Sequence, residues 1–346
     1  MDRPRRRLGL RTWVGLGLSA VLTVWFLRRI EWADLIAALG QVALLPVAGA
    51  AVLLLLEWML RSLRWKVLLR PVAPDAPVTA LFSASVIGAA TNTLLPARAG
   101  EVAKPLVAHR KLGIGLGPLI ASNVMERVFD LVGLVAVLIV TILTMPDQVG
   151  ASAEDLVLVQ KLKIYGGALG AIAATSLGIF FVLVDRGPAA RGTFARILSP
   201  APPPVQRVFL RLFDGFLEGL GSTRDRKGMV QAALLSLAIW FNGAAAIACL
   251  FVAFELPLPL SAACFTSVAI AIAVVVPQAP GFLGTFHVVI EKTLVLWAVA
   301  ATPAAAYAIV FWAVSFVPVT ATGLVALWRE GLTLGGLWQA EPTPEG

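Results

Sequence analysis

Long apolar runs separated by short polar segments dominate this sequence. A transmembrane helix needs about 20 apolar residues to cross the hydrocarbon core of a bilayer, and about six runs approach or exceed this length. We predict membrane-spanning helices at residues 12–27, 42–60, 119–145, 164–184, 229–254 and 304–327. For the first run a cleaved signal peptide is the alternative, but no small-residue cleavage site follows it, so we expect a retained helix.

Two further apolar runs are interrupted by proline and glycine. The first spans residues 78–117 and breaks at Pro-Ala-Arg-Ala-Gly over 96–100. The second spans 260–300 and breaks at Pro-Gln-Ala-Pro-Gly over 277–281. The flanking charges place both ends of each run on one side of the membrane, which predicts two re-entrant hairpins. Non-helical backbone at membrane depth is stable only where protein or water covers it, so both breaks should lie inside the protein.

The charged loops set the predicted orientation. Basic residues cluster at 1–11, 61–70 and 185–228, whereas the loop at 147–155 is acidic. Because cytoplasmic loops are rich in Lys and Arg, we place the basic segments and both termini in the cytoplasm and the protein in the cell membrane. Residues 205–220 have one apolar face, which predicts a helix on the membrane surface or, equally well, a cap on the ends of other helices.

The order of elements is repeated along the chain. Two helices, a broken hairpin and a helix occur in residues 1–163 and again in 164–328, and the tail at 329–346 is expected to be disordered in the cytoplasm. The first half starts inside and the second outside, so the hairpins enter from opposite faces. Such interrupted segments in inverted halves are typical of transporters with a site near the midplane. We therefore predict an all-α polytopic membrane protein built as an inverted repeat, with chance recurrence of Pro and Gly as the alternative.

Composition excludes an ordinary soluble protein. Of the 346 residues, 59% are hydrophobic and 14% are charged, and the mean hydropathy is +0.87. A soluble domain is about one-quarter charged. The net charge of +8 comes from short basic segments beside apolar runs, which suits cytoplasmic loops and anionic headgroups. Because no basic soluble domain is present to bind nucleic acid, membrane lipids are the expected partners.

Ionisable residues gather around the first break. Such groups cost several kcal/mol at membrane depth unless they are paired or hydrated, so a cluster of them indicates a site. If Gly100 opens a helix, its amides and dipole favour an anion there, and Arg98 and Lys104 add positive charge. Arginine and lysine both bind phosphate. We predict that these three residues and Glu101 bind a phosphate-bearing headgroup, with Glu101 fixing Arg98 or contacting a cationic group.

A second charged group follows on the next helix. Glu126 and Asp130 share one helix face, and Arg127 reaches Asp130 at i+3. Together with Asn92 they are interpreted as a relay facing a polar cavity or, with equal weight, as a buried ion-pair network that clamps this helix to the first hairpin. On the second interpretation, loss of Glu126 or Arg127 would lower the folded yield.

The second break has fewer ionisable groups. His287 and Glu291 lie four residues apart on the returning leg and are candidates for a proton-linked switch. No metal-ligand cluster, nucleophile elbow, Walker loop or dinucleotide fingerprint occurs in the sequence, so we expect no metal or cofactor and disfavour an enzyme. The candidate site residues of this hairpin are Pro277, Gln278, Pro280, Gly281, Gly284, His287 and Glu291.

These motifs resemble a known membrane family, the transmembrane, flippase-like region of lysylphosphatidylglycerol synthases and their stand-alone relatives. The resemblance covers nearly the whole chain. Relatives often carry Arg in place of Lys104 and Glu in place of His287, which leaves the headgroup open. The matching residues are Asn92, Leu95, Pro96, Arg98, Gly100, Glu101 and Lys104, then Glu126, Arg127 and Asp130, then Pro280, Gly281, Gly284 and Phe286.

The resemblance implies a protein that moves a phosphate-bearing lipid between leaflets, whether a phospholipid, an aminoacyl-phospholipid or a lipid-linked glycan carrier. We expect a stand-alone member without the synthase domain. One alternative is an intramembrane enzyme acting on a lipid phosphate, with Glu101, Glu126 and Asp130 as acid–base groups. Another is a scaffold for a separate lipid-modifying enzyme, so the partners would be lipids and either that enzyme or a second copy of the chain.

Overall fold

The computed structural model is helical throughout the regular elements that it describes. The predicted helices at 12–27 and 164–184, the amphipathic segment at 205–220 and the tail from residue 334 onward lie outside these residues, apart from single positions. The described residues are 32–95, 98–145, 187–199, 226–275 and 280–333, with positions 164, 175, 202, 206, 210 and 214.

Long helices form the frame of the protein. Four of them, in the described part of the chain, are long and apolar enough to cross a membrane, which identifies an integral membrane protein. They confirm four of the predicted spans, each of which extends beyond the predicted apolar run at one end or both. The four helices are α3 (Leu44–Leu69), α6 (Leu116–Thr144), α10 (Arg226–Ala253) and α13 (Ala301–Arg329).

Two hairpins of shorter helices interrupt this frame. The first consists of α4 (Val78–Leu94) and α5 (Gly100–Leu112), and the second of α11 (Leu260–Val275), the 3₁₀ turn η2 (Pro280–Phe282) and α12 (Thr285–Leu296). In each hairpin the two legs pack against one another. Both breaks fall where Pro and Gly predicted them, and the re-entrant course and the inverted repeat stay predictions.

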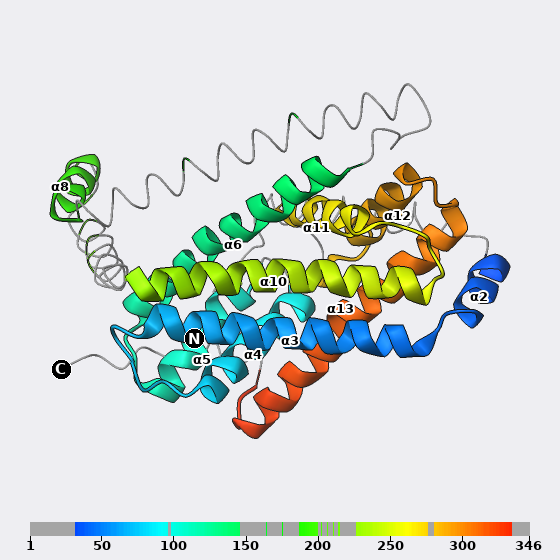
Figure 1. Cartoon of the computed structure of the whole chain (residues 1–346). Helices are drawn as coiled ribbons and strands as arrows, with labels where there is room; N and C mark the ends of the chain where they lie inside the picture. The colour runs from blue at the N-terminus through cyan, green and yellow to red at the C-terminus, as the bar shows by residue number, and fades with distance from the viewer. Residues whose placement is uncertain are drawn as a thin grey trace.

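The two hairpins lie toward opposite ends of the helical frame. Figure 1 shows α3 and α10 side by side, the α4–α5 hairpin toward the end where α3 finishes, and the α11–α12 hairpin toward the end where α3 begins. We call these the first-hairpin end and the second-hairpin end. Each has a buried apolar core, with Trp65, Leu81 and Leu119 at the first and Phe251, Ile290 and Tyr307 at the second.

Glycines let the helices approach closely at the centre of the fold. A Cβ on Gly100 would overlap the carbonyl oxygen of Gly88, so α5 crosses α4 in near backbone contact. A Cβ on Gly133 would overlap the ring of Trp240, and this glycine holds α6 against α10. Small residues at helix crossings are typical of membrane proteins because they permit tight packing without a hydrophobic driving force.

Two stretches differ from the sequence prediction. No helix was predicted between the spans at 12–27 and 42–60, but α2 (Trp32–Gly40) forms there. It packs against α13 because its apolar positions, including the buried Leu35, find a partner. Within the predicted loop at 185–228, residues Gly187–Ile197 form helix α8.

Candidate functional site

A cavity of about 630 Å³ lies between the two hairpins and the long helices. Residues from α3, α4, α5, α6, α10, α11, η2 and α13 line it. The hairpin tips meet beside it, where the Arg98 guanidinium donates a hydrogen bond to the carbonyl oxygen of Val274 in the last turn of α11. The two interrupted hairpins are therefore in direct contact through this bond.

Charged residues concentrate on the side of the cavity nearest the first-hairpin end. On α6 the lining residues change from charged at Glu126, Arg127 and Asp130 to apolar at Leu131 and Leu134. Five cationic and four anionic side chains line the cavity, so positive charge exceeds negative by one. They are Arg61, Arg64, Arg98, Lys104 and Arg127, and Glu57, Glu101, Glu126 and Asp130.

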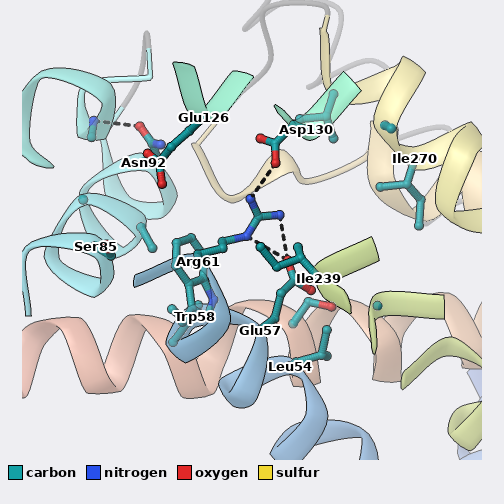
Figure 2. A pocket seen from close by; sticks show the side chains of 18 of the residues that line it. Leu54, Glu57, Trp58, Arg61, Ser85, Asn92, Glu126, Asp130, Ile239 and Ile270 are labelled. Carbon is teal, nitrogen blue, oxygen red and sulfur yellow. Dashed lines mark hydrogen bonds and ion pairs between the residues drawn. The ribbon is translucent and has the colours of Figure 1, made fainter. Parts of the chain in front are cut away.

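Asp130 is the centre of the largest ion-pair group. Arg64 of α3 lies 2.8 Å from its carboxylate, and Arg61 and Arg127 each lie 3.4 Å away. Arg64 is fully buried and also donates to the Ser236 hydroxyl at 2.7 Å. Figure 2 shows Arg61 between Asp130 and Glu57, to which it donates at 2.8 Å. The predicted contact between Arg127 and Asp130 is present but is longer than the one that Arg64 makes.

Lys104 is committed to a buried pair. Its ammonium donates to the Glu126 carboxylate, and both side chains are largely buried. The same ammonium lies 4.1 Å from the ring centroid of Trp65, a favourable position for a cation over an indole. The Trp65 Nε1–H donates to the Ser122 hydroxyl at 2.8 Å. Lys104 and Glu126 thus clamp α5 to α6, as the ion-pair interpretation expected for Glu126.

Glu101 and Arg127 form a pair at the rim of the cavity. Their closest atoms are 2.6 Å apart, and the Arg127 side chain is 59% exposed. Glu101 therefore holds Arg127 rather than Arg98, its expected partner. Of the two interpretations of Arg127, the ion-pair network made it part of a buried clamp, but its exposure makes this a surface pair, which contributes little to stability.

The first turn of α5 begins at Gly100, as predicted, but its leading amide already has a partner. The Gly100 N–H donates to the Asn92 side-chain oxygen at 2.6 Å, and Figure 2 shows this bond at the edge of the cavity. Asn92 thus closes the break by joining α4 to α5, rather than joining the carboxylates of α6.

Arg98 differs from the other cations of the cavity. Within the described part of the chain it is the cavity cation that has no carboxylate partner. It is exposed and has a φ of 52°, a left-handed conformation that non-glycine residues rarely adopt. Such conformations cost of order 1–3 kcal/mol and cluster at ligand sites. The break thus holds one exposed guanidinium between the hairpins.

The rest of the cavity wall is mainly apolar and aromatic. Ser85 and Trp240 bring polar groups to this wall, and their side-chain O–H and N–H find no protein partner among the described residues. Figure 2 shows Leu54, Ile239 and Ile270 facing the charged group. Other apolar lining residues are Leu131, Leu134, Ile247, Val274, Phe282, Phe311, Phe316 and Val319.

Among the predicted residues of the second hairpin, those that the structure describes do not line the cavity. Gly281 and Gly284 have φ of 69° and 82°, so they serve the turn, and Pro280 stands beside them. His287 and Glu291 are buried elsewhere on α12. Pro277 and Gln278 lie outside the described residues. This hairpin instead contributes Ser267, Ile270, Ala271, Val274 and Phe282 to the cavity.

Arg61 and Arg64 are the cationic site residues that the sequence prediction missed. They were assigned to the cytoplasmic end of a helix finishing at Leu60, but α3 continues to Leu69 and carries both into the protein. A signal was available, because Glu57, Arg61 and Arg64 are spaced i, i+4 and i+7 and so share one helix face.

Comparisons with known proteins agree with the resemblance seen in the motifs. Residues 12–323 match the family described as the lysylphosphatidylglycerol synthase TM region. Glycosyltransferase AglD of Haloferax volcanii is 27% identical over 329 residues, covering 88% of this chain and 52% of that protein. The chain therefore spans about half the length of this relative. No solved structure matches the chain described here.

Proposed function

Since the chain belongs to the family of the lysylphosphatidylglycerol synthase transmembrane region, we propose that it binds a lipid with a phosphate-bearing headgroup and moves it between the leaflets of the cell membrane. Both termini would lie in the cytoplasm. The observation that carries this proposal is the exposed guanidinium of Arg98 in a cavity whose other charges are paired.

The charge balance of the cavity supports an anionic ligand. The cations outnumber the carboxylates by one, so a bound anion removes an uncompensated charge from a region of low dielectric. A guanidinium binds a phosphate through two parallel N–H donors. A hydrogen bond to a charged group contributes about 1.5–3 kcal/mol. The other cations are less available because their pairs already satisfy them.

The apolar wall supports a lipid rather than a soluble anion. The volume of about 630 Å³ lies within the roughly 300–1,000 Å³ typical of ligand pockets. A headgroup would occupy the charged side, beside Arg98 and Arg127. The apolar residues of α6, α11 and α13 would face the first carbons of the lipid tails, while the rest of each tail stays in the bilayer.

The contact between the hairpin tips supplies a mechanism for opening. Arg98 now donates to the carbonyl oxygen of Val274, so a lipid phosphate would compete for the same donors. When the phosphate takes the guanidinium, this bridge between the tips is lost and the second hairpin is free to move relative to the first. The paired charges of α3, α5 and α6 would keep the headgroup side rigid during this movement.

Reconstituted vesicles test this proposal. The purified protein should move acyl-chain-labelled phosphatidylglycerol between leaflets, measured by chemical quenching of the label in the outer leaflet. It should not move an equally labelled diacylglycerol faster than empty vesicles do. Equal acceleration of both lipids would contradict headgroup recognition.

The same vesicles separate transport from chemistry. We expect thin-layer chromatography and mass spectrometry of the recovered lipid to show an unchanged headgroup, because the proposal assigns the charged residues of the cavity to binding. A hydrolysed or transferred headgroup would instead favour the intramembrane enzyme.

A further inference from the structure

The second hairpin carries a titratable pair that the lipid site does not use. His287 and Glu291 lie one helical turn apart on α12, and only 7% and 8% of their surfaces are exposed. Neither residue lines the cavity. Ionisable residues within membrane segments are rare because burial is costly, and where they occur they mark relays and ion paths.

The surroundings of this pair contain few other titratable groups. In the described helices that pack on α12, α11 has no Asp, Glu, Lys, Arg or His, and the first charged residue of α13 is Arg329 in its last turn. The titratable groups on these two helices are Cys264 of α11 and Tyr307 of α13. The Tyr307 hydroxyl donates to the backbone carbonyl of Ile247 at 2.9 Å. On α12 itself, Lys292 lies 3.9 Å from Glu291 with its side chain 52% exposed.

Burial disfavours the protonated form of His287, whose surface is only 7% exposed, and two neighbours act against this effect. Its ring lies 5.8 Å from the ring of Trp312, at an angle of 32°. A cation over an indole face is stabilised electrostatically, more strongly where water is excluded. The Glu291 carboxyl group lies one turn along the same helix face. Histidine is also the side chain whose ordinary pKa, about 6.5, allows it to change charge near neutral pH.

Trp312 connects this histidine to the hairpin tip and to the cavity. Its Nε1–H donates to the carbonyl oxygen of Gly281 at 2.7 Å. Its ring lies 5.9 Å from that of Phe316, which stacks on Phe282 at 5.5 Å. Phe316 and Phe282 both line the cavity. A charge on His287 would therefore act on Trp312, the residue that holds the tip. Two aromatic contacts, His287 to Trp312 and Trp312 to Phe316, connect it to the cavity.

We propose that His287, with Glu291 as its counter-charge, is a proton-binding site that couples lipid movement to a proton gradient. A proton from the water on one side binds the neutral imidazole and forms an imidazolium. The same proton leaves from that ring to the other side when the hairpin has moved. One N–H bond forms and breaks in each cycle, and the gradient supplies the energy. The coupling rests on the proposed function, whereas the proton site does not.

Histidine NMR tests the proton site directly. The chain contains two histidines, so H109Q leaves His287 as the single labelled imidazole. His109 lies on α5 outside the cavity, where its Nδ1 contacts the carbonyl oxygen of Ile114 at 2.7 Å, and H109Q should transport like the wild type. In nanodiscs we expect one titration between about pH 4 and 6.5, on the acid side of a free imidazole, because burial disfavours the imidazolium. In H109Q/E291Q its midpoint should move to lower pH because the imidazolium loses its counter-charge. A His287 that keeps one protonation state across this range, or an unchanged midpoint, would overturn the site.

Transport under an imposed pH gradient tests the coupling. A gradient should change the rate at which the wild type and H109Q move labelled phosphatidylglycerol at least about threefold, and should leave H287Q unaffected. An equal response in H287Q would overturn the coupling. If H287Q does not fold, E291Q replaces it. A response of E291Q to the gradient equal to that of the wild type would likewise overturn the coupling. Transport that is absent with and without a gradient refutes the proposed function, and the NMR titration still decides whether the proton site exists.

Discussion

The two hairpins share a backbone plan and differ in chemistry. Each has two packed helical legs joined by a break near Pro and Gly, and each places that break beside the central cavity. The first brings Arg98, Glu101 and Lys104 to the cavity, whereas the second brings apolar residues and one serine. Ion pairs hold the first to its neighbours, while the second is held by aromatic contacts and a bond to Gly281.

This difference shows how one motif can serve both parts of a lipid. A broken hairpin brings polar backbone into a membrane protein under cover of neighbouring helices. The side chains on the hairpin then decide whether it faces a headgroup or the tails. If this account is correct, substitutions in the first hairpin act through charge, and those in the second act through backbone geometry and packing.

The largest expected effect is at the buried pair of the first hairpin. K104M should lower the free energy of unfolding in detergent by about 3–5 kcal/mol, because it leaves Glu126 buried without its partner. K104M/E126L removes both charges and should recover most of this loss. The matched control is K111M, because Lys111 lies on the same helix as Lys104 and pairs with Glu330 in a more exposed position. K111M should lower the free energy of unfolding by less than about 1 kcal/mol. Equal losses for K104M and K111M would contradict the clamp.

Glycine substitutions should also destabilise the first hairpin more than the second. G100A should destabilise by about 1–3 kcal/mol because its methyl group meets the Gly88 carbonyl and the Asn92 side chain. G281A has room, with no atom closer than 3.7 Å, and pays only for its left-handed φ of 69°, about 1 kcal/mol. Thermal unfolding of both variants measures the difference. A larger loss for G281A would show that the second tip is the tighter one.

A smaller effect is expected at the bond that holds the second tip. W312F keeps the aromatic packing but loses the Nε1–H bond to Gly281, so stability should fall by about 0.5–1.5 kcal/mol. W328F on the same helix is the control, because Trp328 is 79% exposed and its loss should be neutral. Indistinguishable melting curves for W312F and the wild type would mean that the bond does not hold the tip.

The smallest effect is expected at the rim of the first hairpin. R127Q removes a pair in which Arg127 is 59% exposed, so the free energy of unfolding should change by about 0.2–1 kcal/mol. Its effect should also shrink further at high salt, which screens exposed charges. A loss above about 2 kcal/mol would restore the buried clamp that the sequence suggested for Arg127.

The outline of the fold could be predicted from the sequence because its signals are local. Apolar length marks the long helices, and Pro and Gly mark both breaks. The extent of α3 could not be predicted in this way, because arginines beside an apolar run usually mark the membrane interface. Arg64 continues the helix instead because it pairs with Asp130, a residue of another helix.

The candidate site was predictable only in part for the same reason. The sequence clusters Arg98, Glu101, Lys104 and Glu126 near one break, and the structure brings them to one cavity. The sequence does not reveal which charges pair. Lys104 was expected to bind the headgroup but forms a buried pair with Glu126, whereas Arg127, a candidate for the buried clamp, lies exposed at the rim. At the second break, Pro and Gly are conspicuous in the sequence, but the residues that face the cavity are ordinary apolar side chains.

The most direct test of the central claim is lipid transport by R98Q. Gln keeps much of the side-chain length and loses the charge, and Arg98 is exposed, so the variant should melt like the wild type. Loss of a charge-assisted bond of about 1.5–3 kcal/mol predicts that phosphatidylglycerol moves roughly 10- to 150-fold more slowly. R110Q removes an exposed charge from α5 outside the cavity and should transport normally. Wild-type transport by folded R98Q would contradict the claim that this guanidinium receives the phosphate.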